Sequence, residues 1–122
     1  MRVLILTRAQ DEHAAYIRAG LVNRGIEVDC WFTSDFPSRQ SQTVSFGIQP
    51  SLKITTDLSE YDLRDYTMAW YRRPNAPNAN YAVIDRRDRE YVHRAGMLYQ
   101  GGLDLLLSKP FGMRSPVWIN AP

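Results

Sequence analysis

Residues 68–74 read Met-Ala-Trp-Tyr-Arg-Arg-Pro, an apolar stretch that runs into two adjacent arginines and a proline. Proline lacks a backbone N–H and pushes the residue before it towards extended geometry, so the stretch predicts a strand that ends at Arg73. Successive side chains of a strand point to opposite faces, so Arg72 and Arg73 are predicted to play unequal roles. Paired guanidiniums at a strand end suit the recognition of carboxylate or phosphate groups.

The chain on either side of this stretch alternates strand and helix patterns, which predicts an α/β fold with a parallel core sheet of about four strands. Residues 2–7 form a continuous apolar run, as in a parallel strand that is buried on both faces. Further strands are predicted near 27–33, 67–72 and 116–119. The strands at 2–7 and 67–72 are predicted to lie in the interior of the sheet.

Two short runs in the middle of the chain, 43–48 and 52–55, alternate polar and apolar side chains around a turn. They predict an antiparallel hairpin near 43–55 that extends or flanks the sheet. The acidic stretch 57–66 is interpreted as a connection with at most one helical turn. Helices at about 12–24 and 81–107 are predicted to cover the faces of the sheet.

Local signals define the ends of the two helices. Asp11 is predicted to cap the first helix, and Gly25 to stop it in left-handed backbone. In the second helix, Asp85 and Arg89 have the spacing of a favourable ion pair. Lys109-Pro110 predicts the end of that helix.

Composition excludes several classes of protein. A chain of 122 residues with 44% hydrophobic and 23% charged residues is predicted to form a single domain with its own core. The net charge of +2 argues against nucleic-acid binding. The longest N-terminal apolar run, 3–6, is too short to span a membrane or to form a signal sequence. The single cysteine, Cys30, fits a reducing cytoplasm and is interpreted as a core residue.

The search for catalytic motifs is negative, and it predicts neither a catalytic residue nor a metal site. The turn at 7–11 after the first strand has no glycine, so it cannot approach a pyrophosphate closely. Of the 15 basic residues only Lys53 and Lys109 are lysines, which leaves few candidates for phosphate-binding lysines. His13 and His93 lack the spacing of metal ligands.

One group of residues remains as a candidate site. Ligands of open α/β sheets bind beyond the carboxyl ends of the strands, and Arg8, Arg72, Arg73 and Asn120 follow predicted strands there. Polar strand ends are also expected simply because they meet water. Arg73 is predicted to face a cleft. Arg72 is predicted to form an internal pair with an acid such as Asp35 or Asp65.

Four motifs in this order resemble a known family. They are Val-Leu-Ile-Leu-Thr at 3–7, Thr-Ser-Asp-Phe-Pro at 33–37, Trp-Tyr-Arg-Arg-Pro at 70–74 and Trp-Ile-Asn-Ala-Pro at 118–122. Together they span the chain and are similar to the N-terminal region of microviridin-type ATP-grasp peptide maturases, the graspetide ligases. The resemblance implies a Rossmann-like pre-ATP-grasp domain without its own nucleotide site.

The resemblance also implies a function for a longer parent protein. Such ligases use ATP and magnesium to activate side-chain carboxylates of a precursor peptide as acyl phosphates, which hydroxyl or amino groups then attack. Residues 1–122 would be the non-catalytic N-terminal fragment, without a cofactor of its own. Arg8, Arg72, Arg73 and Asn120 would bind substrate beside the ATP-grasp subdomains of the same chain.

An alternative stays open on the sequence: a free-standing α/β binding or assembly module without ligase activity. A reading frame that continues beyond Pro122, with a small acidic precursor peptide encoded nearby, would favour the ligase. The sequence leaves the bond type, the identity of the peptide and a homodimer open.

Overall fold

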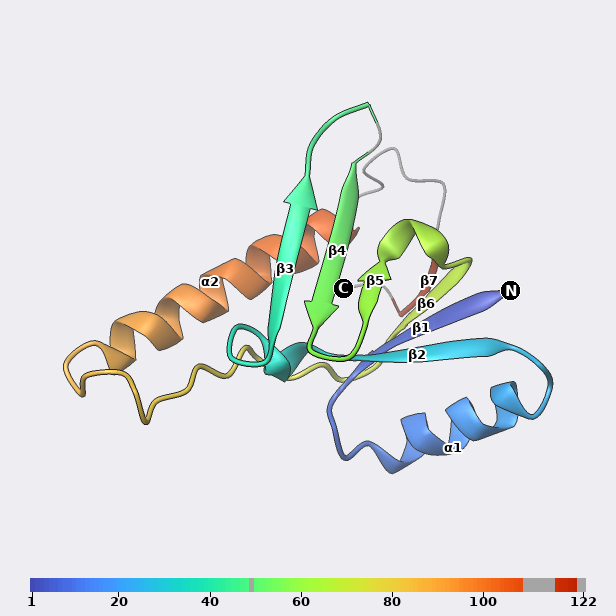
Figure 1. Ribbon diagram of the computed structural model, residues 1–122, viewed down its shortest axis with the longest axis horizontal. Helices are drawn as coiled ribbons and strands as arrows, with labels where there is room; N and C mark the ends of the chain where they lie inside the picture. Colours follow the sequence, from blue (N-terminus) through green and yellow to red (C-terminus); the bar gives the residue numbers. More distant parts are fainter. Residues whose placement is uncertain (49, 109–115, 121–122) are drawn as a thin grey trace.

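The computed structural model describes residues 1–48, 50–108 and 116–120. Within these ranges the chain forms two β-sheets and two α-helices, in the order β1, α1, β2, β3, β4, β5, β6, α2, β7 (Figure 1). Short 3-10 turns follow β2 and β5. The predicted α/β class is confirmed.

The larger sheet is parallel, and its four strands have the order β2-β1-β6-β7. Their bounds are Arg2–Thr7 for β1, Glu27–Phe32 for β2, Met68–Tyr71 for β6 and Val117–Ile119 for β7. The four predicted strands and the interior positions of β1 and β6 are therefore confirmed. The chain moves in one direction from β1 to β2 and in the opposite direction from β6 to β7. Right-handed connections therefore place α1 and α2 on opposite faces of the sheet.

The smaller sheet is antiparallel and is separate from the larger one. Of the two predicted arrangements, a hairpin that extends the parallel sheet or one that flanks it, the second is therefore observed. Its strands are β3 (Gln40–Ser45), β4 (Ser51–Thr56) and β5 (Glu60–Asp62). The interpretation of 57–66 as a mere connection was wrong, because β5 pairs with β4 and places Asp62 opposite Lys53. A three-residue strand is too short to show a period of two in the sequence. The 3-10 turn Leu63–Asp65 matches the single helical turn that was expected there.

Alternate side chains of β1 contribute to two different hydrophobic clusters, as the continuous apolar run predicted. Leu4 and Leu6 pack on the side of the antiparallel sheet, in a cluster that also contains Trp31, Ile54 and Leu103. The neighbouring residues of β1 pack on the opposite side, against α1. That second cluster is smaller: its buried members are Val3, Ile5, Ala14 and Val28. The face of the sheet that carries α1 is therefore the more thinly covered of the two.

Helix α1 (Glu12–Val22) begins and ends at the predicted signals. The side chain of Asp11 accepts a hydrogen bond from the backbone N–H of Ala14, which satisfies one of the free donors at the helix start. Gly25 has a φ of 75°, the left-handed conformation predicted for it.

Helix α2 (Arg89–Ser108) begins later than predicted. Residues 81–88 form turns instead, because side-chain oxygens there bond the local backbone: Asp85 accepts from the N–H of Arg87 at 2.9 Å. The predicted ion pair between Asp85 and Arg89 is therefore wrong, and Asp85 pairs with Arg87 at 3.3 Å. The C-terminal half of α2 packs through Leu103 and Leu107, whereas its N-terminal half projects from the body (Figure 1). The predicted end at Lys109-Pro110 lies outside the described residues.

Candidate functional site

The carboxyl ends of the four parallel strands meet at one edge of the sheet, where the sequence placed the candidate residues. The registers pair Thr7 with Phe32, Leu6 with Tyr71, and Trp70 with Ile119. Arg8, Arg72, Arg73 and Asn120 therefore follow neighbouring strands at the same edge, which we call the carboxyl edge. In open α/β sheets this edge is where ligands bind.

Arg72 ties the end of β6 to the start of α1. Its backbone N–H donates to the carbonyl of Leu6 at 2.8 Å, which continues the strand pairing by one residue. Its Nη2 lies 2.9 Å from Nδ1 of His13, and its Nε lies 3.4 Å from Oδ2 of Asp11. Because a guanidinium has no acceptor, Nδ1 of His13 accepts this bond. Arg72 also lies over the ring of Trp70, at 5.7 Å.

The internal ion pair predicted for Arg72 is confirmed, but with a different acid. Asp35 pairs with Arg39, and Asp65 pairs with Arg2 at 3.9 Å. Asp11 was recognised from the sequence only as a helix cap. Nothing in the sequence places Asp11 beside Arg72, because the two residues meet only when β1 and β6 pair.

Asp11 is the most densely contacted carboxylate of the carboxyl edge, and its side chain is only 5% exposed. Besides capping α1, it accepts a hydrogen bond from Oγ1 of Thr7 at 3.0 Å. Burial alone would raise the pKa of Asp11. The hydrogen bonds from the N–H of Ala14 and from Thr7, together with the charge of Arg72, outweigh burial and lower this pKa below its usual value.

The lowered pKa of Asp11 predicts a contribution to acid denaturation. A carboxyl whose pKa is lower in the folded state stabilises the fold above the pKa of the unfolded chain, about 3.9 for aspartate. That contribution is lost as the pH falls through the lower folded value. The pKa of Asp62 is also lowered, by its hydrogen bonds with Arg64. Substitution of Asp11 therefore removes only the contribution of Asp11 to the pH dependence of the unfolding free energy. Urea titrations below pH 5 should show a shallower loss of unfolding free energy for Asp11→Asn than for the unchanged chain. If the unfolding free energies of the two proteins fell equally steeply with pH, the lowered pKa of Asp11 would be contradicted.

Arg73 and Asn120 have a backbone conformation in common. Their φ angles are 46° and 51°, and no other non-glycine residue in the described ranges has a positive φ. The extended geometry predicted for Arg73 was therefore wrong, and β6 ends at Tyr71 rather than at Arg73. Asn tolerates left-handed backbone, but for arginine the conformation costs about 1–2 kcal/mol. Strain of this kind at an exposed strand end points to a function for the side chain.

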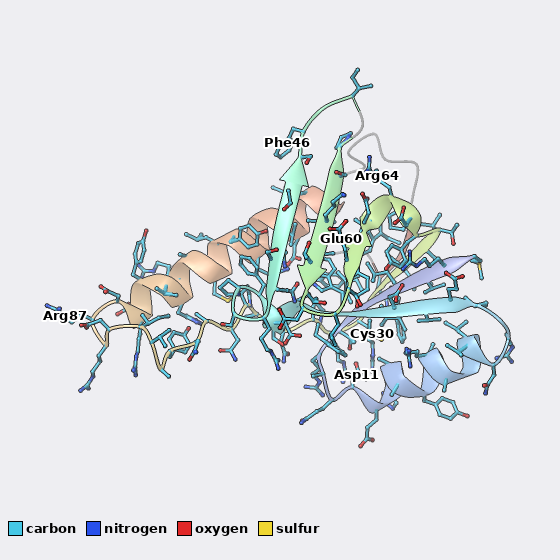
Figure 2. The ribbon with its side chains drawn as sticks, in the orientation of Figure 1. Asp11, Cys30, Phe46, Glu60, Arg64 and Arg87 are labelled. Atoms are coloured by element: carbon cyan, nitrogen blue, oxygen red, sulfur yellow. The ribbon has the colours of Figure 1, made fainter. Side chains whose placement is uncertain are left out.

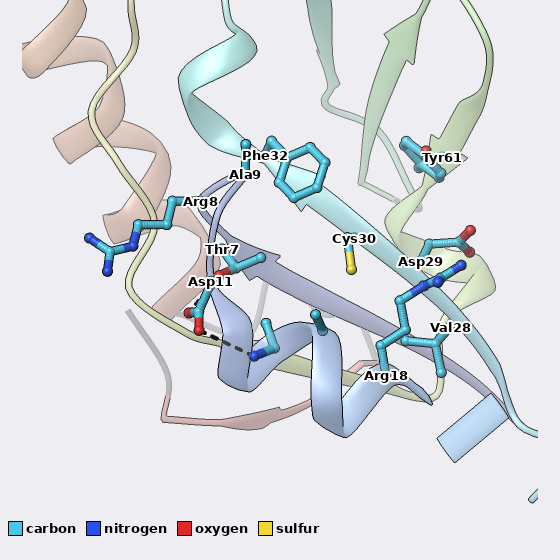
Figure 3. Close-up of a pocket in the computed structure, with 12 residues that line it drawn as sticks. Thr7, Arg8, Ala9, Asp11, Arg18, Val28, Asp29, Cys30, Phe32 and Tyr61 are labelled. Carbon is cyan, nitrogen blue, oxygen red and sulfur yellow. Dashed lines mark hydrogen bonds between the residues drawn. The ribbon is translucent and has the colours of Figure 1, made fainter. Parts of the chain in front are cut away.

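Arg8 and Arg73 are the available cations of the carboxyl edge. Both side chains are exposed, and neither makes an ion pair with any described residue. Asn120 follows β7, the strand next to β6, and its exposed side chain offers an amide. Figure 3 shows the guanidinium of Arg8 pointing away from Cys30, towards the outside of the cleft drawn there. Two free guanidiniums and an amide can bind a carboxylate or a phosphate group.

Other chemistry has little support in the described part of the chain. No three His, Cys, Asp or Glu side chains among residues 1–48, 50–108 and 116–120 are grouped to hold a metal ion. Burial raises the pKa of the Cys30 thiol, which disfavours its reactive thiolate form. In the same ranges, no helix is both long enough and apolar enough to cross a membrane.

Comparison with known proteins gives matches by structure. No protein-family model and no curated protein matches the chain. The solved structure of the macrocyclase MdnC of Microcystis aeruginosa MRC, bound with precursor peptide MdnA, superposes with a TM-score of 0.77 at 21% identity. The RiPP-associated ATP-grasp ligase of Chryseobacterium gregarium also superposes with a TM-score of 0.77, at 16% identity. Its structure was solved with ADP and a leader and core peptide. This chain has the fold of part of these ligases.

The extent of the match is unequal on the two sides. The alignment with MdnC covers 98% of this chain and 37% of the macrocyclase, and that with the Chryseobacterium ligase covers 99% and 35%. A third ligase, PsnB, solved with precursor peptide PsnA2 and AMPPNP, gives a TM-score of 0.54 at 18% identity. The chain thus spans little more than a third of the length of the ligases it matches. The resemblance read from its motifs is confirmed at the level of the fold.

Proposed function

We propose that this chain is the non-catalytic N-terminal domain of an ATP-grasp ligase that cross-links side chains of a ribosomally made precursor peptide. The observation that carries the proposal is the fold match, which uses nearly all of this chain and only about a third of each ligase. The four sequence motifs support the same family and the N-terminal position. The partners are the ATP-grasp subdomains of the same parent chain and the precursor peptide, in the reducing cytoplasm that the free Cys30 fits.

In this function the carboxyl edge is one wall of the substrate cleft. Arg73, Arg8 and Asn120 orient a carboxylate of the peptide or a phosphate group that the other subdomains deliver. Arg72 acts through its neighbours, because its guanidinium is occupied by Asp11 and His13. The strained backbone of Arg73 supports this division of roles, since the strain holds an unpaired guanidinium beyond the strand end.

The parent ligase takes ATP and magnesium, whereas the residues described here do not suit a nucleotide site. The turn after β1 has no glycine for close approach to a pyrophosphate, and Lys53 is engaged by Glu60 at 3.2 Å. We expect titration calorimetry of this chain with Mg-ATP to show no saturable heat. One stoichiometric site of micromolar affinity would contradict the domain assignment.

The decisive experiment uses the natural reading frame in full. The protein encoded from Met1 onward, incubated with ATP, magnesium and an acidic peptide encoded beside its gene, should remove one water from the peptide for each ester or amide bond formed. Mass spectrometry reads this loss directly. A reading frame that ends at Pro122, or a full-length protein that leaves the peptide unchanged, would contradict the proposal.

A further inference from the structure

Strand β2 is an outer strand of the parallel sheet, and among the described residues no strand pairs with its free side. The direction of its backbone groups follows from β1. The carbonyls of Arg2 and Leu6 accept from Thr67 and Arg72, so these residues of β1 direct their backbone groups towards β6. The intervening residues of β1 therefore bond β2. N–H and C=O of one residue point to the same side of a strand, and the next residue points to the other.

The register between β1 and β2 then assigns every residue of β2. Ile5 lies opposite Cys30, and in a parallel pair it bonds the residues on either side of its partner, Asp29 and Trp31. Val28, Cys30 and Phe32 consequently point their N–H and C=O groups outward. One contact supports this assignment independently: the carbonyl of Phe32 accepts a hydrogen bond from Nε2 of Gln40 at 2.6 Å. The backbone groups of Val28 and Cys30 have no such partner among the described residues.

Clefts lie on both sides of this free edge. The first, of about 400 Å³, lies between β2 and α1 and includes Arg18 and Cys30 (Figure 3). The second, of about 300 Å³, lies between β2 and residues 56–61, which run from the end of β4 into β5. Cys30, Phe32 and Tyr61 line both clefts. An added strand would send alternate side chains to opposite sides, so both of its faces would find room.

The charge of the first cleft selects the kind of segment that fits. Its two carboxylates are already satisfied: Asp11 pairs with Arg72, and Asp29 pairs with Arg2 at 3.0 Å and accepts from the hydroxyl of Tyr66. Arg18 also borders this cleft and makes no ion pair with any described residue. Figure 3 shows its guanidinium near Asp29 at the β2 side of the cleft. The available charge on the α1 side is therefore positive.

We propose that the free edge of β2 binds an extended, acidic peptide segment as an additional strand. The outward groups of Val28 and Cys30 form the main-chain hydrogen bonds, and an acidic side chain on the α1 side pairs with Arg18. Main-chain pairing at a sheet edge gives affinity, and pockets for alternate side chains give specificity. The identification of this segment with the precursor peptide rests on the proposed function. The free edge of β2 and the positive charge of the cleft beside it do not depend on that function.

Hydrogen exchange on this chain tests the proposal with a synthetic peptide in which glutamate alternates with valine. In the free chain, the amides of Val28 and Cys30 should exchange at least about tenfold faster than those of Asp29 and Trp31, because only the latter two bond β1. At saturating peptide, the Cys30 amide should slow by about tenfold or more. An unchanged Cys30 amide, with or without binding elsewhere, would overturn the proposal.

Two altered peptides separate backbone pairing from charge, and neither changes the fold of the protein. Methylation of alternate backbone nitrogens removes the donors of the peptide on one edge and should abolish the protection of Cys30. Replacement of glutamate by lysine should weaken binding by about tenfold, the equivalent of about 1.4 kcal/mol. Equal binding of the methylated peptide, or tighter binding of the lysine peptide, would overturn the proposed mode.

Protein variants complete the test. Arg18→Glu should weaken binding of the acidic peptide by about tenfold, whereas Arg24→Glu makes the same charge change on an arginine outside the cleft and should leave it unchanged. If both variants weakened binding equally, the acidic peptide would be responding to the net charge of the protein. That result would overturn the role of Arg18. Protection of Cys30 that grows with protein concentration in the absence of peptide would assign the edge to a second copy of this chain. The ligase assay on the full reading frame is read separately, so either proposal can fail without the other.

Discussion

Arg73→Gly in the full-length ligase should reduce cross-linking of the precursor peptide by about 10- to 100-fold, while this chain keeps its melting temperature. The loss corresponds to a charge-assisted hydrogen bond of about 1.5–3 kcal/mol to a carboxylate or phosphate group. Glycine adopts a φ of 46° without the steric cost that arginine bears there. Relief of that strain and the larger entropy of glycine in the unfolded chain nearly cancel, so stability should change by less than about 1 kcal/mol.

Companion variants distinguish a binding role for Arg73 from a structural one. Arg73→Ala keeps the strained backbone and should lose the same activity, again with little change in the melting temperature. Arg87→Ala is the matched control, because Arg87 lies in the 81–88 turns at the far end of the molecule (Figure 2). Measured rates should be divided by the folded fraction from circular dichroism. If the loss of activity merely followed the loss of folded protein, the cleft role of Arg73 would be refuted.

Asp11→Ala should lower the free energy of unfolding by about 1.5–5 kcal/mol, which we expect to be the largest effect on stability at the carboxyl edge. The substitution removes the cap of α1, which is worth about 0.5–2 kcal/mol. It also leaves the half-buried guanidinium of Arg72 without its carboxylate, which costs a further 1–3 kcal/mol or so. Urea denaturation of this chain, followed by tryptophan fluorescence, measures the sum.

Two more substitutions separate the cap from the ion pair. Asn is an effective helix cap without charge, so Asp11→Asn should cost only about 1–2 kcal/mol. Arg72→Ala should cost about 1–3 kcal/mol, because it leaves the carboxylate of Asp11 without its cation. The double variant Asp11→Asn with Arg72→Ala should cost less than the sum of the two single variants. Additive costs would mean that Asp11 and Arg72 do not stabilise each other.

The parts of the site that depend on local sequence could be predicted. The cap at Asp11 is a local hydrogen bond to a nearby backbone N–H, and Gly25 stops the helix through its own φ. The candidate residues of the carboxyl edge follow from the ends of apolar runs, since parallel strands bring those ends together. An internal ion pair of Arg72 was also predicted, but with Asp35 or Asp65 in place of Asp11.

The predictions were wrong where the conformation of a residue depends on distant parts of the chain or on competing local hydrogen bonds. The start of α2 moved to Arg89 because the side chain of Asp85 bonds its own backbone neighbourhood. Strand β5 is visible only through its pairing with β4. Arg73 was expected to be extended because it precedes proline, yet it has a positive φ. The preference for extended backbone before proline is local, and the tertiary structure at the end of β6 overrides it.

The sequence by itself determined the α/β class, the four parallel strands and the set of polar residues that follow them. These properties depend on apolar periodicity and on helix and turn signals, which act over a few residues and can be read along the chain. Only the tertiary structure decided that Asp11 meets Arg72, that Arg73 stays free, and that β2 is an outer strand with clefts on both sides. Strand order and register bring together residues that are far apart in the chain, and no local pattern encodes those distances.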